Sequence, residues 1–125
     1  MTDPQIEQNR AIVQRLYEVF RSADVAGLTE VLDEHFINHN PQTTNGLAAS
    51  QELFRQVGSI DADIHRMVCE GNLVAVHAYY SAPQRNAGMD FFKIANGKIV
   101  EHWDVVQDIP DWTASGQDLF SELSE

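Results

Sequence analysis

The hydrophobic pattern of the chain changes its period near Gly58. Before this glycine, apolar residues recur at the three- and four-residue spacings of helices; after it, they alternate with polar residues as in strands. We predict helices over about residues 4–22, 25–35 and 46–57, and strands over about 64–70, 73–81, 88–94 and 98–107. The remaining tail, 108–125, has no regular period. Helices followed by an antiparallel meander predict an α+β domain in which a curved sheet wraps the helices.

Helix boundaries can be read from a few residues. Asp3 and Pro4 are typical of an N-cap and a first helical position. Asp24 offers a cap for the second helix, and Pro41 disfavours helical backbone at the residue before it. Gly58 is a typical stop for the third helix.

A hairpin between Met89 and Asp104 carries charge where a simple core hairpin would carry valines. Asp90 lies inside an apolar strand, and the returning strand holds His102 and Asp104. Buried charge is costly unless it is paired. A one-residue slip in strand register would move these side chains to the opposite face, so the turn decides whether they meet.

Two turns fit the hairpin. A two-residue loop at Asn96 and Gly97 places Asp90 opposite Trp103, with His102 on the other face. A three-residue loop that begins at Ala95 and has Gly97 in a bulge places Asp90 opposite His102, and we predict this one.

The predicted turn sorts the hairpin into two faces. One face carries Asp90, Phe92, Val100, His102 and Asp104, and the other carries Met89, Phe91, Lys93, Glu101 and Trp103. Polar groups clustered between apolar walls are typical of a small-molecule pocket.

Composition narrows the classes of partner. The 125 residues are 43% hydrophobic, enough for one domain with a genuine core. The net charge of −11 makes nucleic acid and anionic membranes poor partners. No run approaches the ~20 apolar residues of a membrane span, and the N-terminus does not have the pattern of a signal peptide, so we expect a cytoplasmic protein. Cys69 is the only cysteine, which excludes an internal disulfide.

The sequence also contains two histidines that could bind a metal ion, but their setting makes a metal site unfavourable. His35 and His39 are four residues apart, a spacing that places two ligands on one helix face. The segment from Asn38 to Pro41 is typical of chain leaving a helix, so we expect no metal.

Four stretches, in order and with matching spacing, resemble SnoaL-like proteins, which are relatives of polyketide cyclases within the nuclear transport factor 2-like superfamily. They are Phe36–Pro41, Arg66–His77, Asp90–Lys93 and Asn96–Gln107. Asn38, Lys93 and the short loop over 82–87 depart from the family pattern, in which glutamine often precedes His39 and arginine replaces Lys93.

The resemblance implies a cone-shaped α+β barrel enclosing a pocket, with no metal or cofactor. It implies that Asp90 is the general acid/base of an intramolecular aldol closure, and that His39, His77, His102 and Asp104 line the pocket. Ketosteroid isomerase, similar in fold, keeps an aspartic acid protonated as a hydrogen-bond donor. Whether Asp90 takes a proton or holds one therefore stays open.

Our hypothesis is an aldol-type cyclase or isomerase acting on a carbonyl or polyketide-like ligand. Asp90 would take the proton from a carbon next to the carbonyl, and His102, His77 or Asn38 would donate to the developing enolate oxygen. The predicted catalytic residues are Asp90 and His102, and the predicted substrate-binding residues are His39, Asn38, His77, Asp104, Phe92 and Tyr17. The alternative for Asp90 is a structural carboxylate paired with Lys93 or Arg85.

The other face of the hairpin indicates a surface for binding a partner protein. Phe91 and Trp103 would point away from the pocket, and large apolar groups on an outer sheet face are typical of a partner surface, so we expect a homodimer. A non-catalytic ligand-binding or dimerisation domain is the rival function, because one fold serves many functions.

Overall fold

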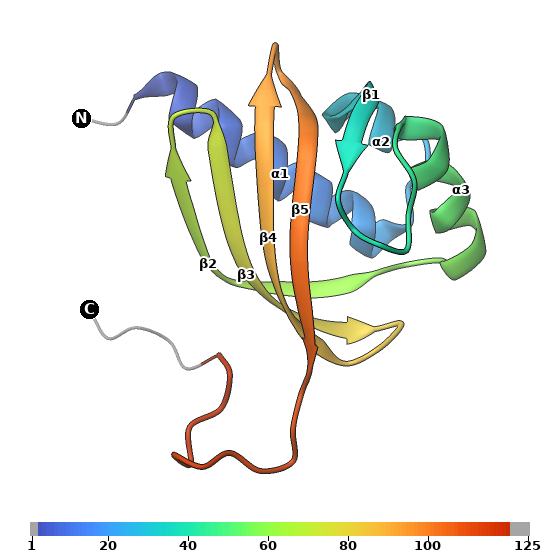
Figure 1. Cartoon of the computed structure of the whole chain (residues 1–125). Helices are drawn as coiled ribbons and strands as arrows, with labels where there is room; N and C mark the ends of the chain where they lie inside the picture. The colour runs from blue at the N-terminus through green and yellow to red at the C-terminus, as the bar shows by residue number, and fades with distance from the viewer. Residues whose placement is uncertain (1–2, 121–125) are drawn as a thin grey trace.

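The structure is a computed structural model that describes residues 3–120; the last residues of the predicted tail, 121–125, lie outside the described part. The described chain forms helices α1 (Pro4–Ser22), α2 (Leu28–Val31) and α3 (Leu47–Val57). Its strands are β1 (Leu32–Asn38), β2 (Asp61–Glu70), β3 (Leu73–Ala82), β4 (Asn86–Ala95) and β5 (Lys98–Asp108). Figure 1 shows these elements along the chain.

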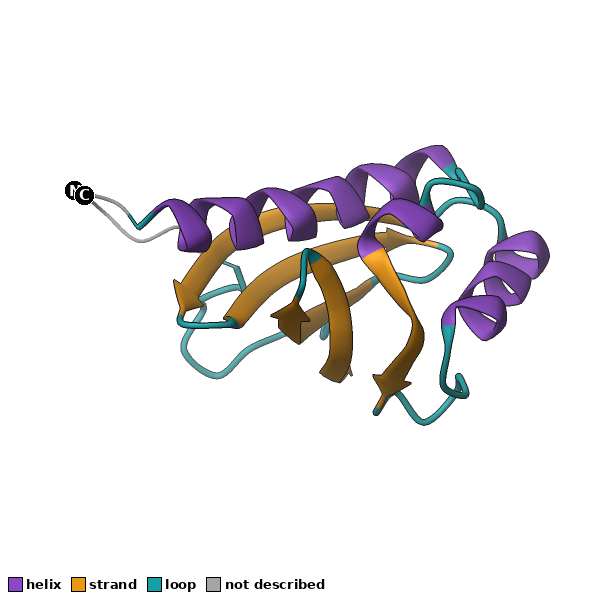
Figure 2. Cartoon of the chain, turned by 90° about the horizontal axis from the view of Figure 1, so that it is seen from above, coloured by secondary structure: helices purple, strands orange, loops and turns teal. Residues whose placement is uncertain are grey.

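The strands form one mixed sheet in the order β1-β5-β4-β3-β2. Strand β1 runs parallel to β5, and the other neighbours are antiparallel. Seen from above, the long helix α1 lies along one side of the curved sheet, and α3 lies beyond the edge formed by β1 (Figure 2). This arrangement confirms the predicted α+β fold, but the sheet is open rather than a closed barrel, with β1 and β2 as its edges.

The core fills the space between the helices and the inner face of the sheet, the face that α1 covers. From α1 it takes Val13, Leu16 and Val19, all at most 2% exposed. The sheet supplies the inward residues of β3, β4 and β5, which are Val74, Val76, Ala78, Phe92, Ile94 and Ile99. The predicted N-cap is confirmed, because the Asp3 side chain accepts from Gln5 N at 2.9 Å.

The predicted second helix is wrong over most of its length. Only Leu28–Val31 is helical, and the chain continues directly as β1. Leu32 and Phe36 are both buried, and their four-residue spacing fits a helix. The structure reaches the same burial in a strand whose pairing with β5 shifts between Leu32 and Ile37. Asp24 caps the preceding turn instead, accepting from Gly27 N at 3.0 Å.

The turn of the β4–β5 hairpin also differs from our prediction. Asn96 and Gly97 have φ values of 53° and 76°, which identify a two-residue type I′ turn. Further along, Lys93 pairs with Glu101, which leaves Val100 as the extra residue of a β-bulge. Asp90 consequently lies opposite Asp104, not opposite His102 as predicted.

The predicted faces of this hairpin are nevertheless confirmed, except for Val100, which is the unpaired residue of the bulge. A three-residue loop takes Ala95 out of the ladder, and a two-residue loop followed by a bulge takes Val100 out of it. Because each removes one residue, the alternation beyond Val100 is the same. Asp90 and Phe92 are 4% and 2% exposed on the inner face, whereas Met89 and Phe91 are each 44% exposed on the outer face.

The last described segment, residues 109–120, contains no helix or strand and returns past the outer face of the sheet (Figure 1). Its Phe120 ring stacks on His65 with ring centroids 4.8 Å apart. No helix within residues 3–120 is long and apolar enough to cross a membrane.

Candidate functional site

A buried carboxylate lies at the centre of the inner face. Asp90 is 4% exposed, and its neighbours supply three hydrogen bonds. The hydroxyls of Tyr80 and Tyr17 donate to Asp90 Oδ2 at 2.6 and 3.0 Å, and His102 Nε2 lies 2.9 Å from Asp90 Oδ1. Neither Lys93 nor Arg85 is among these partners, so the structural pairing considered from the sequence is not the one formed.

Each partner reaches Asp90 from a different element. Tyr17 belongs to the buried stripe of α1, and His102 comes from β5. Tyr80 lies on β3, where it shares the inner face with Val76 and Ala78. A side chain at Gly88 would have its Cβ 2.6 Å from the Tyr80 ring, so the glycine leaves the space in which that ring reaches Asp90.

The two tyrosines are held in their neutral form. Burial, followed by the nearby Asp90 carboxylate, raises the pKa of Tyr17 well above its ordinary value. The same two causes, in the same order, raise the pKa of Tyr80. Both hydroxyls therefore remain hydrogen-bond donors to Asp90 throughout the physiological pH range.

Asn38 fixes the tautomer of His102. The backbone N–H of Asn40 donates to Asn38 Oδ1 at 3.0 Å, which identifies that atom as the acceptor. His102 Nδ1 lies 3.1 Å from the same oxygen, so Nδ1 must carry a proton. The imidazole ring is further held by stacking on Phe92, with ring centroids 4.9 Å apart.

This tautomer places one shared proton between Asp90 and His102. Because Nδ1 is protonated, the 2.9 Å contact from Nε2 to Asp90 Oδ1 needs one further proton, on either atom. The pair can thus accept or release a proton at a buried position, as general acid/base chemistry requires.

The other predicted site residues divide between the two faces. Asp104 joins the Asp90 side, where Asn40 Nδ2 donates to its Oδ2 at 2.8 Å. His39 instead contacts Glu101 at 2.8 Å and stacks on Trp103. His77 pairs with Met89 in the register and contacts Arg66 on the outer face. The structure therefore brings Asn38, Tyr17, Phe92 and Asp104 to the Asp90–His102 pair, but not His39 or His77.

The donor set of a metal site can be tested on the same residues. Asp90, His102 and Asp104 each offer one ligand atom, and these atoms lie within 4.8 Å of one another. All three side chains already form hydrogen bonds, so a cation would have to displace their hydrogen-bond partners. The pair considered from the sequence, His35 and His39, does not form a helical ligand face, because His35 lies on β1 and 86% of its side chain is exposed.

Tyr80 is the main site residue that the sequence analysis missed. Side chains alternate between faces along β3, so Tyr80 lies on the face opposite to Tyr79 and on the same face as Val76. This alternation could have placed Tyr80 on the inner face from the sequence. Asn40 lies in the segment that the sequence indicates as chain leaving a helix, and its contact with Asp104 spans 64 positions in the chain. That contact depends on the parallel pairing of β1 with β5, which the local pattern of the sequence does not indicate.

His102 is the more accessible member of the pair, since 16% of its side chain is exposed against 5% for Asp90. A ligand that approaches the pair from solvent would meet His102 first.

Comparison with known proteins supports a common fold. The family model of the SnoaL-like domain matches residues 13–102. A candidate ketosteroid isomerase from Kribbella flavida superposes with a TM-score of 0.74 at 18% identity, covering 96% of this chain and 93% of that one. A candidate SnoaL-like polyketide cyclase from Jannaschia has a TM-score of 0.69 at 19% identity, over 85% and 90% of the two chains.

A third similar structure has no function in its name. It is a nuclear transport factor 2-like protein from Burkholderia xenovorans, with a TM-score of 0.75 at 19% identity over 87% of this chain and 90% of that one. No curated protein matches the chain.

Proposed function

The chain belongs to the SnoaL-like domain family, and from this premise we propose that it is a cofactor-independent enzyme acting on a carbonyl-containing small molecule. The proposed reaction is an aldol-type cyclisation or an isomerisation. It is supported at the level of class by two similar structures, one named as a candidate polyketide cyclase and one as a candidate ketosteroid isomerase. The single observation that supports this proposal most is the buried Asp90 carboxylate with His102 at 2.9 Å. A buried carboxylate within hydrogen-bond reach of a histidine has the geometry that general acid/base chemistry requires.

The chemistry begins at a carbon next to a carbonyl. In the proposed step, Asp90 takes a proton from this carbon, and the electron pair of the broken C–H bond moves to the carbonyl oxygen as an enolate. Once Asp90 Oδ1 has taken the proton, the Nε2–H of His102 beside it is released and can donate to that oxygen. The amide of Asn38 is a second donor within the same cluster. His77, which the sequence analysis considered as a donor, has no role in the proposed step because it lies on the other face of the sheet.

The two tyrosines have a positioning role in this proposal. Their hydroxyls hold Asp90 Oδ2, so Oδ1 is the oxygen left to exchange protons with His102 or with substrate. Phe92 stacks against the imidazole and keeps that exchange away from bulk water. A fixed, partly dry acid/base pair is suited to removing a proton from carbon.

The test follows proton removal directly, with 2-tetralone as a carbonyl probe in D₂O. We expect the wild type to accelerate deuterium entry next to the carbonyl, and Asp90→Asn to lower that acceleration by about 10² to 10⁴-fold. Asp108→Asn, an exposed aspartate of β5, makes the same chemical change away from the site and should leave the rate unchanged. NMR measures the exchange, and equal rates for wild type and Asp90→Asn would refute the role of Asp90.

A non-catalytic binding or dimerisation domain is the second candidate. One observation favours it: an apolar patch lies on the outer face. This outer apolar patch consists of Val68, Met89, Phe91 and Val105, which are 44–74% exposed. We propose that a second copy of the chain covers it, since exposed apolar patches are typical of interfaces.

Sedimentation tests the homodimer. Phe91→Glu should convert the dimer to monomer, whereas Trp112→Glu, which places the same charge at a 76% exposed position in the tail, should not. A monomeric wild type would remove the dimer from the proposal and leave the Asp90 chemistry untouched.

A further inference from the structure

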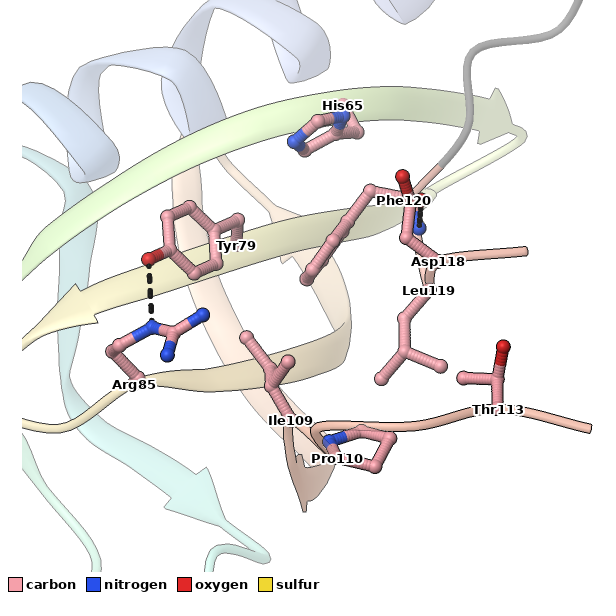
Figure 3. A pocket seen from close by; sticks show the side chains of 9 residues that line it. All are labelled: His65, Tyr79, Arg85, Ile109, Pro110, Thr113, Asp118, Leu119 and Phe120. Carbon is pink, nitrogen blue, oxygen red and sulfur yellow. Dashed lines mark hydrogen bonds between the residues drawn. The ribbon is translucent and has the colours of Figure 1, made fainter. Parts of the chain in front are cut away.

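A cavity of about 350 Å³ lies between the outer face of the sheet and the returning tail. Its lining, drawn in Figure 3, consists of His65, Tyr79, Arg85, Ile109, Pro110, Thr113, Asp118, Leu119 and Phe120. Tyr79 and Tyr80 are neighbours in β3, and their side chains point to opposite faces. This cavity is therefore separated from the Asp90 site by the thickness of the sheet.

Arg85 is the cation of this cavity, and its pairing is unusual for so acidic a chain. Its Nε donates to the Tyr79 hydroxyl at 3.2 Å. Arg15, Arg21 and Arg55 all form ion pairs with carboxylates. Within residues 3–120, Arg85 has no carboxylate within 4.0 Å, although the chain has 19 acidic residues. Its guanidinium thus keeps terminal N–H groups in the geometry that binds a carboxylate.

Aromatic and aliphatic side chains form the walls. The Phe120 ring stacks on His77 with centroids 5.4 Å apart and meets Tyr79 edge-on at 5.3 Å. In Figure 3, Ile109 and Leu119 extend from the tail toward the space beside Phe120. A flat apolar group matches such walls, because aromatic rings favour stacked or edge-to-face neighbours.

The charges also limit the ligand to one negative group. Arg85 and Asp118 lie at opposite sides of the cavity in Figure 3. Asp118 Oδ1 accepts from Phe120 N at 2.7 Å, which holds its carboxylate beside the wall. A second anionic group at that side would meet a like charge, which is destabilising.

We propose that this cavity is a second small-molecule site, which binds a monoanion with a flat apolar body and holds the anionic group on Arg85. The size of the cavity lies within the range of small-molecule sites, and its lining combines apolar walls with few polar groups in the way such sites do. This inference is independent of the chemistry at Asp90.

The probe is 2-naphthoate, and its neutral amide, 2-naphthamide, is the matched control. We expect 2-naphthoate to bind the wild type saturably, with NMR shifts centred on Tyr79, Arg85 and Phe120. Arg85→Gln should weaken its binding about tenfold, because a charge-assisted hydrogen bond is lost. The amide should bind wild type and Arg85→Gln equally, since it has no charge to lose.

Two further variants make the result decisive. Lys93→Gln removes the same charge elsewhere on the outer face and should leave 2-naphthoate binding unchanged. Asp90→Asn should also leave it unchanged, because the two sites lie on opposite faces. Equal binding of 2-naphthoate by wild type and Arg85→Gln, equal losses in Arg85→Gln and Lys93→Gln, or shifts centred on Phe91 would each overturn the proposal.

Discussion

The two faces of the sheet treat a charged group in opposite ways. On the inner face, Asp90 is 4% exposed and has two tyrosine hydroxyls and an imidazole as partners. On the outer face, Arg85 is exposed and has one hydroxyl as partner. Adjacent residues of β3 serve the two groups, Tyr80 on the inside and Tyr79 on the outside.

The difference shows what stabilises each charged group. A carboxylate removed from water depends on protein donors, because burying a charge is costly unless it is hydrogen-bonded. An exposed guanidinium is solvated by water and needs no such partners. The inner group is therefore part of what holds the fold, and the outer group is free to serve binding.

Removing the two charges should produce the largest contrast. Asp90→Leu is expected to lower the free energy of unfolding by about 3–5 kcal/mol, because it leaves its buried partners without an acceptor. Arg85→Leu should change it by less than about 0.5 kcal/mol, as is usual for surface substitutions. Urea denaturation measures both, and similar losses in the two variants would contradict the division between the faces.

The neighbouring tyrosines give a finer version of the same contrast. Tyr80→Phe removes the 2.6 Å hydrogen bond to the buried Asp90 and should cost about 1–3 kcal/mol. Tyr79→Phe makes the same chemical change on the outer face and should cost less than about 0.5 kcal/mol. Both substitutions keep the aromatic ring, and thermal unfolding measures the stability of each variant. A larger loss of stability in Tyr79→Phe than in Tyr80→Phe would contradict our assignment of the faces.

The smallest expected difference between the two faces is in how stability depends on alkaline pH. The raised pKa values of Tyr17 and Tyr80 mean that the folded chain keeps these protons after the unfolded chain has lost them. Their contribution to stability is complete below the unfolded value near 10 and is lost as pH rises above it, by up to about 1.4 kcal/mol per pH unit for each group.

The matched variants test this pH dependence. Tyr80→Phe removes one titrating group, so unfolding measured from pH 9 to 11 should depend less steeply on pH than in the wild type. Tyr79→Phe should keep the wild-type steepness. An unchanged slope in Tyr80→Phe would show that Tyr80 titrates alike in the folded and unfolded chains.

The sequence predicted the composition of the hairpin faces better than their register. Alternation of apolar and polar residues reports which side chains share a face, and it placed Asp90, His102 and Asp104 together. It does not report where an extra residue is accommodated, because a longer turn and a bulge at Val100 give the same alternation. His102 consequently reaches Asp90 from a diagonal position, one pair of residues away from the predicted one.

Long-range pairing explains the remaining errors. Leu32 and Phe36 fit a helix as well as a bulged strand, and only the parallel partner β5 decides between them. The role of Tyr80 depends on the pairing of Val76 with Asp90 across the β3–β4 hairpin. His77 alternates correctly with Tyr79, but the local pattern does not say which of the two faces of β3 meets α1.

The bulge at Val100 has a consequence in genetic terms. Loss of the Val100 codon alone would remove the bulge and leave a regular ladder, in which Lys93 still pairs with Glu101 and His102 stays on the inner face. Loss of a second codon, that of Glu101, would exchange the faces beyond that point and send His102 and Asp104 outward. Selection on this segment is therefore expected to tolerate the loss of one residue between Ile99 and His102 but not the loss of two.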